Sequence, residues 1–213
     1  KSKIPKLLIL EFSDWSRNQK KCLKKIYSFF SECNLIIRSS VKEEDGTSKS
    51  FAGYFDSVAN INLQDETLII KAIKKVFSSY RKTKLRKNSQ ILIQQMIEDV
   101  SMSGVILTKD INTGAPYYVI NYDDETGRTD TVTAGTDYKN RSLYILRGQE
   151  NSLESKRFIN LIKSVKEIEK IFKSNEIDIE FALDKNNIVY IFQIRKITTY
   201  NYWDETLEKK IKK

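Results

Sequence analysis

The strongest constraint on the fold is a pair of alternating segments near the end of the chain. They are IDIEFALD at residues 177–184 and IVYIFQIRKIT at residues 188–198, separated by KNN. Because successive side chains of a strand point to opposite faces, this alternation predicts two strands that each bury one face. We expect an antiparallel hairpin that turns through a tight primed turn at Asn186 and Asn187.

The expected hairpin separates an apolar face from a polar face. The apolar side chains, which must pack on a core, are Ile179, Phe181, Leu183, Ile188, Tyr190, Phe192 and Ile194. On the other face, the tight turn places Glu180 opposite Gln193 and Asp178 opposite Arg195. A slip of one residue would expose the apolar set to water, so the register is well specified.

The polar face has the chemistry of a metal and phosphate site. A carboxylate beside an amide oxygen offers the hard oxygen ligands that Mg²⁺ takes, with phosphate and water completing the octahedron. An arginine two residues after the amide can bind a phosphate oxygen in bidentate fashion. The alternative is a solvent-facing strand with an exposed Asp–Arg pair of little energetic value, and the hairpin alone favours that alternative.

The remaining pattern alternates helices with strand-rich blocks. Apolar residues at helical spacing predict helices over 17–31, 66–82 and 152–173. Strands are expected at 34–40, 90–97, 104–110, 116–123, near 131–135 and near 142–148. This arrangement indicates an α+β protein, and the polar connector RKTKLRKNS at 81–89 is the best candidate for a boundary between subdomains.

Composition excludes several classes of function. The chain has no histidine, which excludes Ser-His or Cys-His catalysis and histidine-ligated metals within it. The lysines behind the net charge of +9 are scattered over the predicted helices, as on solvated faces. The two cysteines read as reduced thiols, and no apolar run approaches the roughly 20 residues of a membrane span. The start, KSKIPKLLILEF, lacks a signal-peptide cleavage site, so we expect a cytoplasmic protein without a membrane partner.

A second candidate anion site lies earlier in the chain. Arg38 follows an apolar run in IIRSS, and SFAGYFDS follows at 50–57. Ala52 and Gly53 let the backbone approach a ligand closely, and successive N–H groups can surround phosphate oxygens. The alternative is an ordinary turn between two strands.

Taken together, three segments resemble one family. IIRSSVKEEDGTSKSFAGYFDSVANI resembles the arginine strand and phosphate loop of the nucleotide-binding domain of pyruvate phosphate dikinases and phosphoenolpyruvate synthases. ILIQQMIEDVSMSGVILTKDINTG resembles the adenine hinge of that family, and IEFALDKNNIVYIFQIRKIT resembles its metal-binding hairpin. The resemblance implies an ATP-grasp fold with two mostly antiparallel subdomains and flanking helices, at residues 1–93 and 94–213.

The resemblance also implies a role for each matched residue. Arg38 contacts the ATP phosphates, Ser50, Ala52, Gly53 and Tyr54 form the loop over them, Gln95, Met96 and Ile97 line the adenine, Glu180 and Gln193 hold Mg²⁺, and Arg195 stabilises charge on the transferring phosphoryl group. Arg38 and Arg195 are thus the expected catalytic cations. Phosphoryl transfer asks a protein chiefly for positioning and for cations placed where charge develops.

The sequence departs from the family pattern in three ways. No glycine–lysine segment precedes Arg38, so we expect the first subdomain to be truncated at its start. Glu180 and Gln193 are one residue further apart than the family pattern, which indicates a bulge. The family passes phosphate to a histidine on a separate domain, so with no histidine here we expect this chain to be part of a longer enzyme.

The resemblance leaves the phosphate acceptor open. The stretch APYYVINYDDETGRTDTVTAG resembles the synthase-like kinases of bacterial capsule loci, which include an L-glutamine kinase. The alternatives are a phosphoenolpyruvate synthase or an antibiotic phosphotransferase proper, a scaffold that binds nucleotide without turnover, and a basic nucleic-acid-binding module. The last requires exposed aromatic side chains interleaved with arginines, whereas the hairpin aromatics are predicted to be buried.

Overall fold

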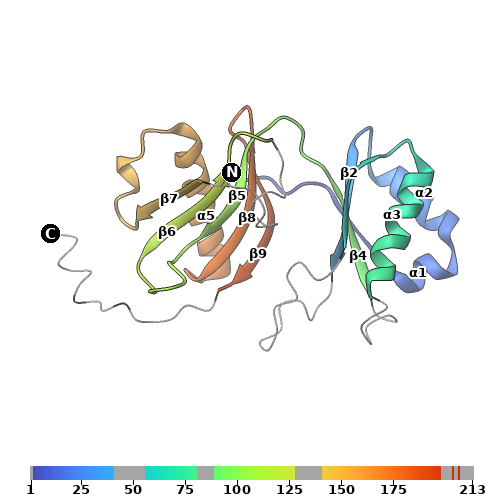
Figure 1. Ribbon diagram of the computed structural model, residues 1–213, viewed down its shortest axis with the longest axis horizontal. Coiled ribbons are helices and arrows are strands. Elements are labelled where there is room, and N and C mark those ends of the chain that lie inside the picture. Colours follow the sequence, from blue (N-terminus) through green and yellow to red (C-terminus); the bar gives the residue numbers. More distant parts are fainter. Residues whose placement is uncertain are drawn as a thin grey trace. The chain divides into compact units, whose positions relative to one another are not determined.

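The protein folds into two compact units. The computed structural model describes residues 2–40, 56–80, 89–127 and 141–197, together with Trp203 and Thr206 (Figure 1). The N-terminal unit is Pro5–Ile97, and the C-terminal unit combines Lys1–Ile4 with Glu98–Lys213. The division therefore follows Ile97, whereas the sequence prediction placed it after residue 93.

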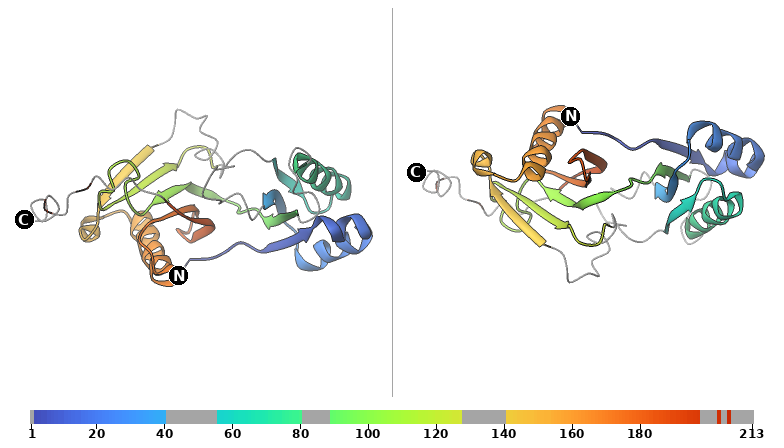
Figure 2. Two further views of the ribbon diagram at one scale, coloured as in Figure 1. Left: turned by 90° about the horizontal axis from the view of Figure 1, so that it is seen from below. Right: turned by 90° about the horizontal axis from the view of Figure 1, so that it is seen from above.

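The N-terminal unit is a four-stranded antiparallel sheet with helices on one face (Figure 2). Its elements are β1 (Leu7–Glu11), α1 (Phe12–Arg17), α2 (Gln19–Phe29), β2 (Asn34–Ser40), β3 (Ser57–Asn62), α3 (Glu66–Ser79) and β4 (Gln90–Gln95), and the strand order is β1-β4-β2-β3. The polar connector at 81–89 lies between α3 and β4, which both belong to this unit, so it does not separate the two units.

Side-chain hydrogen bonds cap the N-termini of both long helices of this unit. Asn18 accepts a hydrogen bond from the N–H of Lys21, and Asp65 accepts one from the N–H of Leu68. Such caps satisfy backbone donors that the first turn of a helix leaves free. Helix α2 lies within the segment predicted to be helical over 17–31, whereas α1 was not predicted, and the non-helical backbone of Asn18 separates the two helices. The apolar sides of α2 and α3 then pack with the sheet into one core.

The C-terminal unit is a five-stranded antiparallel sheet with one long helix against it (Figure 2). Its elements are β5 (Val100–Leu107), β6 (Tyr117–Asp123), β7 (Arg141–Leu146), the short 3₁₀ helix η3 (Glu150–Ser152), α5 (Lys156–Phe172), β8 (Ile177–Asp184) and β9 (Val189–Lys196). The strand order is β7-β6-β5-β8-β9. The core lies between this sheet and α5, and no other described helix covers the opposite face, which we call the open face.

Gly104 lets β5 and β6 approach closely in this sheet. A Cβ atom added at Gly104 would lie 2.0 Å from the carbonyl oxygen of Asn121. No side chain fits at that separation without moving the backbone of β6, so this position requires glycine.

The start of the chain belongs to the sheet of the C-terminal unit. The N–H of Lys3 donates to the carbonyl of Val189 at 2.8 Å, and the N–H of Ile191 donates to the carbonyl of Lys3 at 2.9 Å. Since Pro5 already belongs to the N-terminal unit, the chain passes between the units twice.

The expected fold class is confirmed: the protein is α+β, with two antiparallel sheets and flanking helices. The strand expected near 131–135 lies outside the described residues. Among the described residues, no helix has both the length and the apolar character needed to cross a membrane.

Candidate functional site

The final hairpin has the predicted pairing. Glu180 on β8 lies opposite Gln193 on β9, and Asp178 lies opposite Arg195. All four side chains therefore belong to the open face, because directly paired residues of neighbouring strands share a face.

A bulge at Phe192 accounts for the extra residue of spacing. Glu180 pairs with Gln193, but the next residue, Phe181, pairs with Ile191. Phe192 is thus the additional residue of the bulged strand, as the spacing between the two site residues predicted.

Because of the bulge, the residues of β9 that face the core near the turn differ from those predicted. Val189 and Ile191 are buried in the core beside Phe181, at 3% and 6% exposure. The sequence analysis had assigned these places to Tyr190 and Phe192, which are only half-buried. Continuous alternation fails here because one inserted residue reverses the faces of every residue on its turn side.

The turn also differs from the prediction. Of Asn186 and Asn187, only Asn187 has a positive φ, at 58°, whereas a type I′ primed turn needs positive φ at both central residues. Instead, four residues, Lys185 to Ile188, connect the strands. Asp184 fixes this connection: its carboxylate accepts hydrogen bonds from the N–H groups of Asn186 and Ile188, both at 2.9 Å.

Glu180, Gln193 and Arg195 form one polar cluster. Nη2 of Arg195 lies 3.0 Å from Oε1 of Glu180 and 3.3 Å from Oε1 of Gln193. Glu180 is 8% exposed. The guanidinium therefore supplies positive charge at the carboxylate and amide oxygens, the place where the sequence analysis expects a cation.

The donor set of this cluster fits Mg²⁺ better than a metal that needs a complete protein cage. Within the described residues, no group of three or more His, Cys, Asp or Glu side chains could hold a metal ion. Mg²⁺ keeps several water ligands and binds through one or two protein oxygens plus substrate phosphates. Glu180 and Gln193 offer one carboxylate and one amide oxygen, which suits that pattern.

Asp178 joins the cluster, although the sequence analysis gave it no role. Its Oδ1 atom is buried without a hydrogen-bond partner, and so is Nε of Arg195, which lies on the paired residue. Burial raises the pKa of the Asp178 carboxyl above its ordinary value, and Glu180 adds to this, while Arg195 opposes it. Two unpartnered polar atoms on neighbouring side chains indicate a place for a polar ligand or ordered water.

The strand pairing extends the cluster into two rows across the open face. One row runs Arg195, Asp178, Leu107, Val119 and Tyr144, and the other runs Gln193, Glu180, Val105, Asn121 and Ser142. Val105 and Leu107 are half-buried. An apolar strip therefore adjoins the charged cluster, an arrangement that suits a ligand with one apolar and one anionic end.

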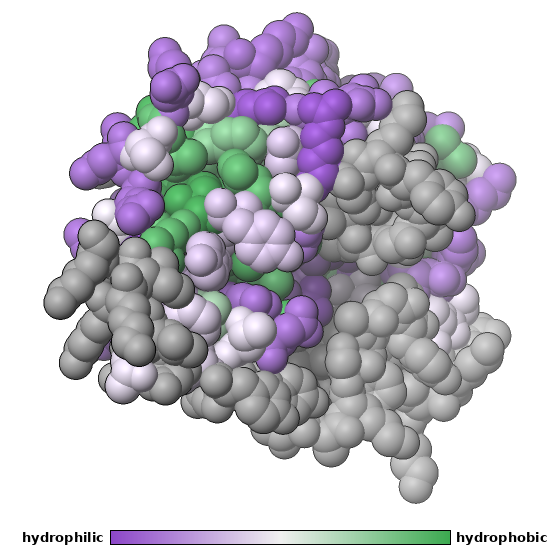
Figure 3. Space-filling model, turned by 60° about the vertical axis from the view of Figure 1, so that its left-hand side comes forward, coloured by the Kyte–Doolittle hydropathy of each residue, from purple (hydrophilic) through white to green (hydrophobic). Residues whose placement is uncertain are grey.

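Hydrophobic side chains gather on the side of the molecule where β6 and β7 lie in Figure 1, surrounded by hydrophilic ones (Figure 3). Tyr144 on β7 is 59% exposed, and its ring contacts that of Tyr117 edge-on, with the centroids 6.4 Å apart. The outer strands of the sheet thus leave apolar surface in reach of solvent.

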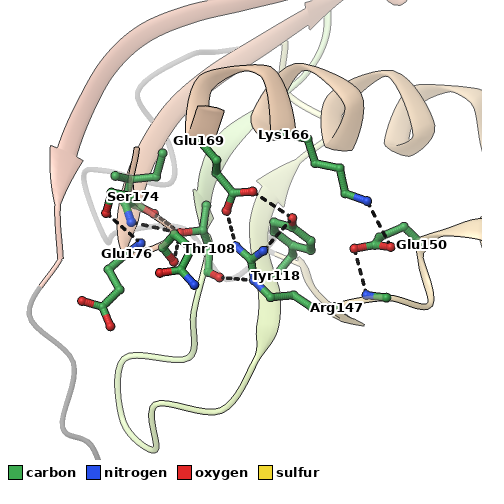
Figure 4. Close-up of polar contacts among 11 residues, drawn as sticks. Thr108, Tyr118, Arg147, Glu150, Lys166, Glu169, Ser174 and Glu176 are labelled. Carbon is green, nitrogen blue, oxygen red and sulfur yellow. Dashed lines mark hydrogen bonds and ion pairs between the residues drawn. The ribbon is translucent and has the colours of Figure 1, made fainter. Parts of the chain in front are cut away.

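A polar network holds the strand ends that carry the cluster (Figure 4). Arg147 donates to the carbonyl of Thr108 at 3.0 Å, to the hydroxyl of Tyr118 at 3.0 Å and to the carboxylate of Glu169. The hydroxyl of Thr108 accepts from the N–H of Ile177 at 2.9 Å, where β8 begins. This network fastens β8 to β5 and α5 next to Asp178.

Arg38 lies on the corresponding face of the N-terminal unit. It pairs with Ser57 and Leu92 across the sheet and is half-buried. Its neighbours Leu35 and Ile37 alternate into the core under the helices, so Arg38 belongs to the face turned away from α2 and α3.

The residues expected to line the adenine are the last residue of β4 and the two residues after it. The N–H of Gln95 donates to the carbonyl of Lys6 at 3.0 Å, and that of Met96 donates to the carbonyl of Asn34 at 2.8 Å. Ile97 follows, and its N–H has no backbone acceptor among the described residues. The expected phosphate loop, Ser50, Ala52, Gly53 and Tyr54, lies outside the described residues.

Similar solved structures define the class of fold. The D-alanine–D-alanine ligase of Helicobacter pylori superposes with a TM-score of 0.51 at 13% identity, covering 92% of this chain and 50% of the ligase. The L-amino acid ligase of Bacillus licheniformis gives a TM-score of 0.51 at 13% identity, covering 92% of this chain and 39% of the ligase. The protein thus has an ATP-grasp-like fold.

Residues 8–129, more than half of the 213 residues, match the family of the pyruvate phosphate dikinase AMP/ATP-binding domain. The chain belongs to this family.

A more distant relative is a far larger protein. The prodigiosin-synthesizing transferase PigC of Serratia marcescens is 27% identical over 95 residues, which are 41% of this chain and 10% of PigC. The chain thus matches about a tenth of this relative and at most half of the two ligases described above.

Proposed function

We propose that this chain binds Mg-ATP for phosphoryl transfer. The observation that carries the proposal is the cluster of Glu180, Gln193, Arg195 and Asp178 on the open face, in a member of an AMP/ATP-binding family. In this proposal the phosphoryl group passes to a histidine on a separate domain and then to a small-molecule acceptor, as the family resemblance implies.

Each residue of the cluster has a proposed task. Glu180 and Gln193 would hold Mg²⁺, which would neutralise charge on the phosphates. Arg195, now turned to Glu180 at 3.0 Å, contacts the transferring phosphoryl group and stabilises the charge that spreads over its oxygens. Asp178 orients Arg195 from the paired position on β8.

The N-terminal unit carries further residues with proposed roles in ATP binding. Arg38 binds phosphate oxygens, with Ser50, Ala52, Gly53 and Tyr54 forming the loop over them. Gln95, Met96 and Ile97 line the adenine. The N–H of Ile97, which has no backbone acceptor in the described ranges, supports this assignment, because a backbone donor can recognise the edge of a base.

The acceptor remains a matter of proposal. L-glutamine in capsule synthesis is supported only by the resemblance of residues 115–135, and a phosphoenolpyruvate synthase or an antibiotic phosphotransferase would use the same ATP cluster. A shared nucleotide module does not define the acceptor.

The experiment is calorimetric titration of the 213-residue chain with ATP, with and without Mg²⁺. Glu180→Gln keeps the shape and removes the charge, so we expect it to bind ATP equally with and without the metal. We expect Arg38→Ala to weaken binding about tenfold, equivalent to about 1.4 kcal/mol. Lys196→Ala, next to Arg195 at the end of β9, is the matched control and should bind as the unaltered chain does.

Two outcomes would contradict the proposal. Unchanged ATP binding in both Glu180→Gln and Arg38→Ala would show that these residues do not form the ATP site. Retention on single-stranded DNA that falls with salt and does not respond to ATP would favour the nucleic-acid alternative instead.

A further inference from the structure

A cleft in the N-terminal unit lies outside the proposed ATP site. It has a volume of about 750 Å³ and is formed between the region of α1 and helix α3. Its lining residues are Phe12, Trp15, Ser16, Gln19, Lys71, Lys74, Lys75, Phe77 and Ser78. None of them carries a role in the proposed function, so the two sites can be tested separately.

The apolar part of the cleft is made of three aromatic side chains. Trp15 and Phe77 are buried, at 3% and 4% exposure, and the rings of Phe12 and Phe77 meet edge-to-face at 5.2 Å. These rings form a fixed wall, because packed aromatic pairs prefer this geometry.

Trp15 also has an unused hydrogen-bond donor. Its indole N–H makes no hydrogen bond to any described residue and, unlike that of Trp203, is not a buried atom without a partner, so it is open to solvent and to a ligand in the cleft. An oxygen atom of a bound partner could accept a hydrogen bond from this N–H group.

The other part of the cleft is positively charged. Lys71, Lys74 and Lys75 are exposed, follow one another at helical spacing on α3 and have no ion-pair partner among the described residues. The described residues that line the cleft include no acidic side chain. Helices α2 and α3 together carry seven lysines and a single acid, Glu66.

From these observations we infer that the cleft binds an acidic protein segment that carries an apolar anchor residue. The anchor occupies the aromatic wall, the carboxylates pair with the three lysines, and a carbonyl or carboxylate oxygen accepts from Trp15. Charge complementarity identifies this partner: an apolar wall beside unpaired ammonium groups fits a chain of acidic residues around one hydrophobic side chain. Nucleic acid fits less well, because no arginine, with its fork of donors, is among the described residues that line the cleft.

The test uses the 213-residue chain and three probes. They are a labelled peptide of glutamates around one phenylalanine, the same peptide with lysines in place of the glutamates, and oligodeoxythymidylate. Binding is followed by fluorescence anisotropy and by the Trp15 indole N–H resonance, identified in a Trp203→Phe background because the chain has only two tryptophans. We expect the acidic peptide alone to bind and to shift the Trp15 resonance.

Matched variants separate the cleft from general positive charge. The cleft variant combines Lys71→Glu, Lys74→Glu and Lys75→Glu, and the control combines Lys20→Glu, Lys24→Glu and Lys25→Glu on α2, with the same change in net charge. We expect the cleft variant to weaken peptide binding at least about tenfold and the control to change it by less than about threefold. If the cleft variant folds poorly, lysine-to-glutamine changes at the same three positions test the same contacts.

Three results would overturn the inference. The first is no binding of the acidic peptide, and the second is equal weakening by both triple variants. The third is preferential binding of oligodeoxythymidylate with the Trp15 shift, which would identify a nucleic-acid site. Mg-ATP affinity should be the same in the cleft variant and the unaltered chain, so failure here leaves the proposed function untouched.

Discussion

At the scale of the residue, Asp178 shows how burial changes the chemistry of the open face. Its carboxyl lies on β8 between a half-buried apolar neighbour, Leu107, and the guanidinium of Arg195. Burial is the larger influence and raises the pKa of Asp178 despite the nearby cation. Keeping this carboxyl ionised in the folded protein therefore carries a cost to folding.

This cost predicts a pH-dependent stabilisation by Asp178→Asn. A carboxyl whose pKa is raised in the folded state contributes stability below its unfolded pKa and loses it as the pH rises through the folded value. We therefore expect the asparagine variant to unfold at a higher temperature than the unaltered chain at pH 7. The difference should shrink as the pH falls to about 4, near the ordinary aspartate value.

Thermal unfolding followed by circular dichroism at several pH values checks this prediction. Asp56→Asn, at an exposed position, controls for the loss of one negative charge. A lower unfolding temperature for Asp178→Asn at pH 7 would mean that attraction to Arg195 outweighs burial.

The roles at the residue scale were only partly predictable from sequence. The pairs Glu180–Gln193 and Asp178–Arg195 followed from alternation with a period of two, and the structure confirms them. The unpartnered oxygen of Asp178 was not predictable. It depends on the neighbouring strand β5, which is distant in the sequence and pairs only in the folded protein.

At the scale of the element, the Arg147 network joins strand ends to a helix. The Arg147 and Glu169 side chains are 21% and 13% exposed, so this ion pair is largely removed from water. Its loss would also leave the hydroxyl of Tyr118 and the carbonyl of Thr108 without their donor.

We therefore expect Arg147→Met to lower the free energy of unfolding by about 2 kcal/mol. Methionine keeps an aliphatic side chain but leaves the carboxylate of Glu169 without its cation. Removing one partner of a largely buried ion pair costs more stability than removing one partner of an exposed pair. Urea denaturation followed by circular dichroism measures the change. Lys185→Met is the control, because its pair with Asp99 is 64% and 62% exposed and should matter by less than about 1 kcal/mol.

Equal effects of these two variants would contradict a special role for Arg147. So would an Arg147→Met protein with unchanged unfolding, since it would mean that solvent replaces the lost contacts freely.

Elements with strong periodicity were predictable, and those defined by distant pairing were not. Helices α3 and α5 lie within the segments predicted from apolar spacing. The sequence analysis assigned no element to β1, whose five residues acquire strand structure by pairing with β4 from residue 90 onwards. Helix α1, which precedes the segment predicted to be helical from residue 17, was also not predicted, because its six residues are too few to show a helical period.

At the scale of the whole molecule, the N-terminal unit has a core of its own. Every buried residue of that core falls between Leu8 and Ile93, inside the unit Pro5–Ile97. A compact unit with a complete core has what it needs to fold alone.

We therefore expect a fragment of residues 5–97 to fold cooperatively. Its free energy of unfolding should be roughly 5 kcal/mol, as for other small domains. Denaturation followed by Trp15 emission checks this, since the fragment contains no other tryptophan. We expect the matching fragment 98–213 to be less stable than the same unit in the full chain, because it lacks the two hydrogen bonds of Lys3. A broad, non-cooperative transition for 5–97 would show that its core is insufficient.

The place where the units divide could not be read from composition. The most polar connector, at 81–89, joins two elements of one unit, whereas the division after Ile97 follows directly on the ordered strand β4. Polarity identifies solvent-exposed chain, but contacts between distant strands decide which elements share a core.

The bulge at Phe192 has a consequence for how relatives of this protein are compared. A chain with one residue fewer in β9 can keep the same amide and guanidinium in place, since the bulge accommodates the surplus without altering either end of the strand. An alignment that starts from Glu180 and forbids a gap inside this strand would therefore place Phe192, rather than Gln193, opposite the amide of a chain without the bulge.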